Sequence, residues 1–366
     1  MRFKSLDVLL NPNKIIPHYD SRINASQKAP FPISAELHWT SNCNYDCTHC
    51  SYGSRRKTTN YLTDEIIKAL IQDLTDMNCK AVYLSGGGEP TVIKKWDHYT
   101  EHLISGGAEV ALITNGIAVL DKHIKTIRKM NYVAVSVYST QEERYREITG
   151  SKFFNRQFSL PKSIKSSKSN TIVGARCVLN RINYDELYEL YCAAIDAGFD
   201  YIIFIPAVDY EGRGVFLEDR WIERVQSNIK EVFDKFDHTR TNVKALLKKK
   251  VSHYSDGNYL DGISSIGLDS CGAIKIGSSI FFNYDGGVYL CQPDIGNKEL
   301  EIGNLNDNRF MDIWNSSRHD EVIKILNKRW RGGSCKNCRS IAFNKAIDTY
   351  KENPVDVHNF NKDCFL

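Results

Sequence analysis

The chain has 366 residues, room for about two domains, and its 42% hydrophobic and 25% charged content is that of an ordinary globular protein. With 48 Lys and Arg against 44 Asp and Glu, the formal charge of +4 is too balanced to indicate a nucleic-acid-binding or membrane-surface protein. Eleven cysteines are the unusual feature, and they are spread too widely for a small disulfide-rich secreted domain.

Strands and helices alternate along the first part of the chain. Apolar periodicity predicts strands over residues 35–39, 81–85, 109–114, 132–138, 172–179 and 201–205. Between them it predicts helices over residues 63–78, 95–105, 121–130 and 185–197, the first of them capped by Thr63. This alternation predicts a parallel sheet with right-handed crossovers.

The pattern changes after residue 207. A helix is predicted over residues 217–236, followed by a polar stretch and then a hairpin of strands 279–283 and 288–291. Two short helices, 307–314 and 319–326, follow the hairpin. The first residues carry no signal or transit peptide, and no run of ~18 apolar residues predicts a membrane span. We therefore expect a cytoplasmic protein whose cysteines are ligands, catalysts or packing residues.

Three cysteines lie together just after the first predicted strand. Cys43, Cys47 and Cys50 have the spacing C-x3-C-x2-C. A structural zinc site is closed by four ligands, whereas three thiolates suit a [4Fe–4S] cluster with one iron open to an exchangeable ligand. The alternative is a zinc site that takes His49 or a remote residue as its fourth ligand.

The loop CNYDCTHC, residues 43–50, resembles the cluster loop of the radical S-adenosylmethionine (SAM) superfamily. The resemblance implies that His49 lies beside the adenine of SAM. The sequence SGGGEP, residues 85–90, is similar to the family's GGEP segment. The residues that would bind the methionyl amino group are Gly86, Gly87, Gly88 and Glu89. Glycines let a backbone approach a ligand closely, although such a sequence is also a good turn.

Further SAM contacts are implied at the ends of later strands. The resemblance places Thr114, Asn115 and Ser136 near the ribose hydroxyls. Arg176, with Asn180 beyond it, would meet the SAM carboxylate, since a guanidinium grips a carboxylate bidentately. An interior salt bridge is the alternative role for Arg176. The family resemblance implies a partial (β/α)6 TIM-type barrel with its ligands at the carboxyl ends of the strands.

A second group of cysteines follows in the C-terminal part of the chain. Cys271 and Cys291 bracket the hairpin, and Cys335 and Cys338 form a C-x2-C pair. Four such thiols can hold zinc or a complete [4Fe–4S] cluster. The pattern resembles the SPASM/twitch extensions of radical SAM enzymes. Asn344 stands where a full SPASM domain has its next cysteine, which favours the shorter twitch form with one auxiliary cluster, in a small α+β domain.

Four cysteines remain outside both groups. Cys79 and Cys192 are predicted to pack in helices. Cys177 follows Arg176, and strand alternation puts the two side chains on opposite faces. Cys364 lies in the tail, which can fold over the active site. Cys177 and Cys364 are the candidate catalytic thiols, which would donate a hydrogen atom to a substrate radical, and simple packing or tail positions are the alternatives.

The resemblance also divides the chain and suggests a function. The predicted divisions are an N-terminal extension (1–34), the radical SAM partial barrel (35–225), a linker or helical segment (226–270), the twitch domain with the auxiliary [4Fe–4S] cluster (271–345) and a C-terminal tail (346–366). We expect an oxidoreductase or epimerase that forms a 5′-deoxyadenosyl radical from SAM, with electrons from a donor such as flavodoxin or ferredoxin.

The substrate is the least determined feature of the sequence. Only 34 residues precede the first strand, too few for a leader-binding domain of ~80 residues, which favours a polar small molecule such as a sugar-like or aminocyclitol ring. The charged segment 209–214 is a candidate contact for it. A radical SAM maturase of a ribosomally made peptide is the alternative, and a zinc-binding module without catalysis is the alternative of another class.

Overall fold

A single sheet of nine strands forms the centre of the molecule, in the order β6-β5-β4-β3-β2-β1-β7-β8-β9. The computed structural model describes residues 6, 10–23, 29–53, 60–166, 168–207, 217–248, 267–335, 338, 340–354 and 364–366. The strands are β1 Ser34–Leu37, β2 Ala81–Leu84, β3 Glu109–Thr114, β4 Tyr132–Ser136, β5 Ile172–Leu179, β6 Tyr201–Pro206, β7 Ser279–Phe282, β8 Gly287–Tyr289 and β9 Glu301–Asn304. The segment 209–214 lies outside the described residues.

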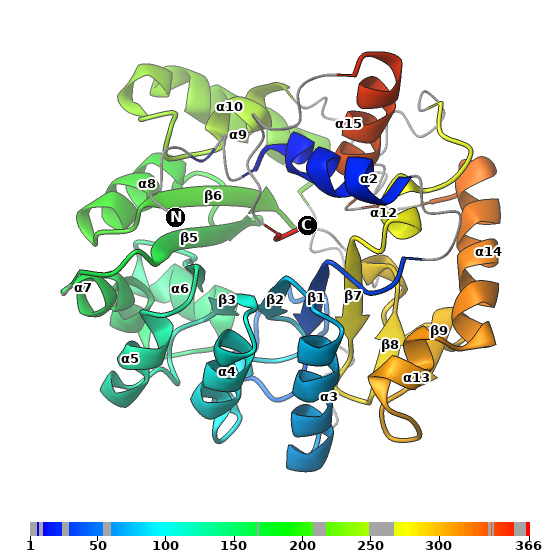
Figure 1. Ribbon diagram of the computed structural model, residues 1–366. Helices are drawn as coiled ribbons and strands as arrows, with labels where there is room; N and C mark the ends of the chain where they lie inside the picture. Colours follow the sequence, from blue (N-terminus) through cyan, green and yellow to red (C-terminus); the bar gives the residue numbers. More distant parts are fainter. Residues whose placement is uncertain are drawn as a thin grey trace.

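The predicted parallel sheet and partial barrel are confirmed. Strands β1 to β6 pair in chain order and in parallel, and β6 and β9 remain as separate edges of an open sheet. The sheet curves, with α3, α4 and α5 on its outer side (Figure 1). The helices are α2 Ile16–Ile23, α3 Asp64–Asp76, α4 Trp96–Ser105, α5 Ile124–Ile127, α6 Glu142–Thr149, α7 Leu160–Lys165, α8 Leu187–Asp196, α9 Asp219–Glu231, α10 Val243–Lys248, α12 Gly272–Lys275, α13 Phe310–Trp314, α14 Ser317–Arg331 and α15 Ile341–Glu352.

The two faces of the sheet differ in what they bury. Alternate residues of β4 and β5, such as Val133, Val135 and Ala175, join the large core that includes residues of the outer helices. The residues between them, such as Tyr132 and Arg176, point to the inner side of the curve. Strand alternation therefore directs polar side chains inward while the outer face is packed with aliphatic ones.

The C-terminal hairpin extends the same sheet. The predicted hairpin forms β7 and β8, and β7 pairs in parallel with β1, so its strands continue the barrel sheet beyond β1. The N-terminal extension, expected to be irregular, contains η1 (Pro12–Ile15) and α2, and both contact α15. These contacts have no local sequence signal, because they join segments more than 300 residues apart.

Several helices differ from those that the apolar periodicity predicted. The predicted cap at Thr63 is present, since its side chain accepts a hydrogen bond from the backbone N–H of Ile66. The helix expected over 121–130 is only a short turn followed by α5, while α6, α7 and α15 were not predicted. None of the helices among the described residues has the length and apolar character needed to cross a bilayer.

Candidate functional site

The loop with Cys43, Cys47 and Cys50 lies at the carboxyl ends of the central strands. None of the three cysteines forms a disulfide, and all three are partly exposed. The Sγ atom of Cys43 is 4.0 Å from the side-chain nitrogen of Asn115, just after β3, and that of Cys47 is 4.0 Å from the hydroxyl of Tyr138, just after β4. The three thiols therefore occupy the edge where ligands bind in α/β barrels.

The cysteine loop is supported by α6, a helix that the sequence did not predict. The backbone N–H groups of Asp46 and Thr48 donate hydrogen bonds to the carbonyls of Thr149 and Ile148, at 2.8 and 2.9 Å. Below them, the hydroxyl of Tyr45 is 2.7 Å from that of Tyr145. Two of these bonds join backbone atoms, so sequence alone gave no signal for the support.

The glycine-rich loop after β2 packs directly against the chain that enters the cysteine loop. Gly86 and Gly87 have φ angles of 49° and 69°, and a Cβ on Gly86 would lie 2.1 Å from the His38 ring. A Cβ on Gly88 would lie 1.9 Å from the Asn42 carbonyl oxygen. The glycines are thus required by protein packing, and their role in SAM binding stays a prediction.

Glu89 joins this glycine loop to the end of β3. Its buried carboxylate accepts hydrogen bonds from the Thr114 hydroxyl at 2.6 Å, the Asn115 backbone N–H at 2.8 Å and the Thr91 backbone N–H at 3.1 Å. Burial raises the pKa of Glu89, and the hydrogen bonds act in the opposite direction. Glu89 and Thr114 were predicted to contact SAM, and in this structure they contact each other.

Replacing Glu89 by alanine should weaken both the fold and SAM binding. The change leaves four buried donors, two of them on Thr91, without their acceptor, and each unmet donor costs about 1–3 kcal/mol. We expect a lower thermal unfolding midpoint and weaker SAM binding in calorimetry. The control is Glu147→Ala on the exposed face of α6. Wild-type SAM affinity and an unchanged midpoint in the Glu89 variant would contradict this role.

The remaining predicted SAM contacts divide into two groups. His49 is buried with its ring centroid 5.1 Å from that of Tyr138, and Ser136 pairs in register with Arg176 across β4 and β5. These side chains lie at or face the inner side near the cysteine loop. Asn180, in contrast, accepts a hydrogen bond from the Ile182 backbone N–H at 2.8 Å and is buried in its own turn.

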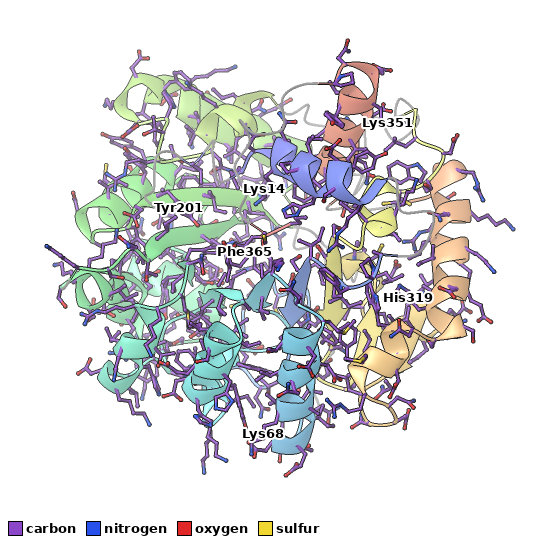
Figure 2. The ribbon with its side chains drawn as sticks, viewed as in Figure 1. Lys14, Lys68, Tyr201, His319, Lys351 and Phe365 are labelled. Carbon is purple, nitrogen blue, oxygen red and sulfur yellow. The ribbon has the colours of Figure 1, made fainter. Side chains whose placement is uncertain are left out.

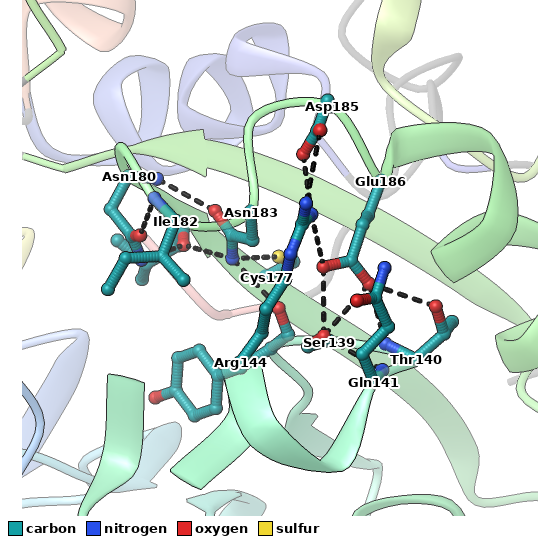
Figure 3. Close-up of polar contacts among 12 residues, drawn as sticks. Ser139, Thr140, Gln141, Arg144, Cys177, Asn180, Ile182, Asn183, Asp185 and Glu186 are labelled. Carbon is teal, nitrogen blue, oxygen red and sulfur yellow. Dashed lines mark hydrogen bonds and ion pairs between the residues drawn. The ribbon is translucent and has the colours of Figure 1, made fainter. Parts of the chain in front are cut away.

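A buried carboxylate fixes the neighbouring loop after β5 (Figure 3). Glu186 accepts hydrogen bonds from the hydroxyls of Ser139 and Thr140, each at 2.9 Å or less, and from the guanidinium of Arg144 at 2.9 Å. Arg144 also binds Asp185 at 2.7 Å. The network joins the start of α6 to the loop after β5. It therefore helps to position α6, the helix whose last residues support the cysteine loop.

The structure corrects the prediction that Cys177 is a catalytic thiol. Cys177 is fully buried in the core between the sheet and the outer helices, and Asn183 donates a hydrogen bond to its sulfur at 3.5 Å (Figure 3). Burial raises the pKa of this thiol. Arg176 faces the inner side, so alternation directs Cys177 away from any substrate there. It is a packing residue.

The position of Cys364 is also corrected, because it lies at the opposite end of the barrel from the cysteine loop. Its backbone N–H donates to the carboxylate of Glu109, the first residue of β3, at 3.1 Å. Asn115, which contacts Cys43, lies six residues further, and six residues of strand span about 20 Å. Figure 2 shows the adjacent Phe365 on the inner side of the sheet, where it packs against Tyr83. The described end of the tail, residues 364–366, therefore does not cover the cysteine loop.

Replacing Cys364 by alanine should therefore leave catalysis intact. A hydrogen donor must reach the substrate radical, and the distance along β3 prevents this. We expect unchanged rates of 5′-deoxyadenosine and product formation, measured by liquid chromatography and mass spectrometry. Accumulation of a substrate-derived radical or loss of product in this variant would show that the thiol is used.

The second group of cysteines lines a cavity of about 400 Å³ beside β7 and α14. All four of them, Cys271, Cys291, Cys335 and Cys338, contribute to its wall. Burial raises the pKa of each of these thiols, to about 12 for Cys338, so binding of a metal centre here releases protons. Four thiols around one cavity are the donor set that a complete [4Fe–4S] cluster requires.

Asn344, the residue in place of a further cysteine, is fully buried beside this cavity. Its side-chain oxygen accepts from the Gly272 backbone N–H at 2.7 Å, and its side-chain nitrogen donates to the sulfur of Cys271 at 3.4 Å. Among the described residues, no three His, Cys, Asp or Glu side chains converge on a single ion. A four-iron cluster does not need such convergence, because each thiolate binds a different iron.

Comparison with known proteins agrees with this arrangement. The radical SAM superfamily model matches residues 37–194, which span β1 to α8, and the SPASM iron–sulfur cluster-binding domain model matches residues 271–339. The second match begins at Cys271 and includes Cys338. Both are families of iron–sulfur proteins, so the zinc-binding module is no longer favoured.

Two curated relatives and one solved structure illustrate the similarity. Mycofactocin maturase MftC of Mycolicibacterium smegmatis is 25% identical over 325 residues, 88% of this chain and 79% of the relative. The cysteine-type anaerobic sulfatase-maturating enzyme of Clostridium perfringens is 22% identical over 86% of this chain and 92% of its own length. Streptococcus suis SuiB, solved with its precursor peptide SuiA, shares the fold at a TM-score of 0.59 and 14% identity, covering 83% of this chain and 67% of SuiB. The chain therefore contains a radical SAM domain over residues 37–194 and a SPASM/twitch iron–sulfur domain over residues 271–339, and its cofactors are SAM and [4Fe–4S] clusters.

Proposed function

We propose that this protein is a radical SAM maturase that modifies a ribosomally made peptide. The observation that carries the proposal is the similarity to mycofactocin maturase over 88% of the chain, through the barrel and the auxiliary cavity alike. A second relative of similar extent is named for maturing a sulfatase, which is a polypeptide substrate. This reading replaces the polar small molecule that the short N-terminal extension favoured.

Residues of this chain would hold the cofactors at separate places. Cys43, Cys47 and Cys50 would hold the cluster that binds SAM, which when bound supplies the electron that cleaves SAM to methionine and a 5′-deoxyadenosyl radical. The four cysteines of the second cavity would hold the auxiliary cluster. Its four protein ligands leave no open iron, so electron transfer suits it better than substrate ligation.

The inner face of the barrel supplies the side chains that would orient a peptide. His38 is buried at the end of β1, where its Nε2 is 2.8 Å from the Glu36 carboxylate and its Nδ1 is 3.0 Å from the Tyr52 hydroxyl. Arg176 points to the same inner side from β5. Glu36, held in place by His38, and Arg176 would bind polar parts of the substrate beside the cysteine loop and hold the reacting carbon in a defined place.

The substrate class can be tested directly with reconstituted enzyme. Short peptides encoded beside the gene, and an aminocyclitol as the small-molecule probe, would be incubated separately with SAM and dithionite. We expect a mass change in a peptide together with 5′-deoxyadenosine, and transfer of deuterium from the labelled peptide to 5′-deoxyadenosine. Turnover of the aminocyclitol with none of the peptides would overturn the proposal.

A further inference from the structure

A partly buried ion pair places an arginine, Arg329, in the wall of the auxiliary cavity. Asp294 ends the short helix η7 (Gln292–Asp294), which begins directly after Cys291, and Arg329 lies in the last turn of α14. The two guanidinium nitrogens Nη1 and Nη2 donate to the two carboxylate oxygens at 2.8 and 2.6 Å. This bidentate geometry fixes the plane of the guanidinium.

One donor of Arg329 has no hydrogen-bond partner in the part of the chain that the structure describes. Asp294 uses both terminal nitrogens, while the third nitrogen, Nε, is buried and makes no hydrogen bond within the described part of the chain. A buried N–H group without an acceptor is costly, so such a group in a native protein points to a missing partner. Arg329 lines the same cavity as the four cysteines, and it is the only arginine among the described residues that line it.

Arg329 shares the wall of this cavity with all four cysteines. Its guanidinium is always positively charged and offers only hydrogen-bond donors. The positive charge and the unmatched Nε–H therefore lie at the cavity where the sulfur atoms of a cluster and its ligands would be.

We propose that Arg329, held in place by Asp294, donates its Nε–H to a sulfur of the auxiliary cluster or of its ligands and raises the cluster's reduction potential. Hydrogen bonds to sulfur and local net charge are among the properties by which proteins set the potential of iron–sulfur clusters. A positively charged donor favours the reduced cluster, which carries one more negative charge. Asp294 both orients the guanidinium and partly neutralises it. The inference rests on the cluster in this cavity and not on the peptide substrate.

The test is a redox titration of the auxiliary cluster in the full-length chain. Cys43, Cys47 and Cys50 are replaced by alanine, so that only the auxiliary cluster contributes to the electron paramagnetic resonance signal. We expect Arg329→Gln to lower the midpoint potential and Asp294→Asn to raise it. Arg331→Gln, an exposed position on the same helix, is the matched control and should leave the potential unchanged.

The outcomes separate this inference from the ligand assignment. A cluster with about four irons and the same potential in Arg329→Gln and Arg331→Gln would overturn the role of Arg329. If Arg329→Gln does not assemble its cluster, Arg329→Lys provides the comparison, because it keeps the positive charge but lacks the guanidinium group and its Nε–H. A midpoint potential equal to that of wild type in Arg329→Lys would then exclude the Nε–H bond. Failure of the triple-alanine parent to bind any iron would overturn the assignment of the cavity itself, and this inference with it.

Discussion

Replacing Cys43 by alanine should reduce 5′-deoxyadenosine formation to the level of the enzyme-free reaction. Cys43 is one of only three thiols in its loop, so the variant retains two ligands for a cluster that needs three from the protein. Reconstituted wild-type protein should bind about eight irons, as two four-iron clusters require, and the variant about four. Iron analysis and chromatography of the reaction mixture measure both quantities.

Cys192→Ala is the matched control for this experiment. Cys192 lies on α8 and packs against the outer core, away from the cysteine loop, so we expect full iron content and normal 5′-deoxyadenosine formation. If Cys43→Ala still cleaves SAM, or if wild-type protein is colourless and holds zinc, the assignment of this loop to the SAM-binding cluster is wrong.

Replacing Cys335 by alanine should separate SAM cleavage from product formation. Cys335 belongs to the cavity beside α14 and not to the cysteine loop at the barrel edge, so the first cluster stays intact. We expect 5′-deoxyadenosine to form while the substrate remains unmodified, because the electron path through the auxiliary cluster is lost. Parallel measurement of 5′-deoxyadenosine and of product mass gives the ratio between the two.

The neighbouring substitution Ser334→Ala controls for local disturbance. Ser334 is exposed at the end of the same segment, and its replacement should leave both measurements unchanged. Full product formation by Cys335→Ala would contradict an electron-transfer role for the auxiliary cluster. Loss of SAM cleavage in this variant would indicate that the two sites do not act separately.

Some residues that were predicted to contact SAM form hydrogen bonds within the protein instead. Thr114 and Glu89 are hydrogen-bonded to each other, and Asn180 is hydrogen-bonded within its own turn, although the motif comparison predicted that all three contact SAM. Motif position tells which strand end a residue occupies, but not which hydrogen bonds its side chain already makes. Those bonds depend on loops that meet only after folding.

Cys177 and Cys364, which lie outside both cysteine groups, show the same difference between local pattern and tertiary contact. Alternation along β5 correctly separated Arg176 from Cys177, because the period of a strand is a local property. The position of Cys364 could not be obtained in that way. Its contact with Glu109 joins residues 255 apart, and only the packing of Phe365 on the inner side decides which end of the barrel the tail reaches.

The sequence by itself determined the order of the six barrel strands, the three-cysteine loop and the four further thiols. Each of these depends on periodicity or spacing over a few residues, where local sterics and chemistry decide the outcome. Only the tertiary structure decided that β7 continues the sheet beside β1, that α6 supports the cysteine loop, and that Arg329, bound to Asp294, lines the auxiliary cavity. The physical reason is that these contacts join distant segments, whose pairing depends on burial in the whole molecule.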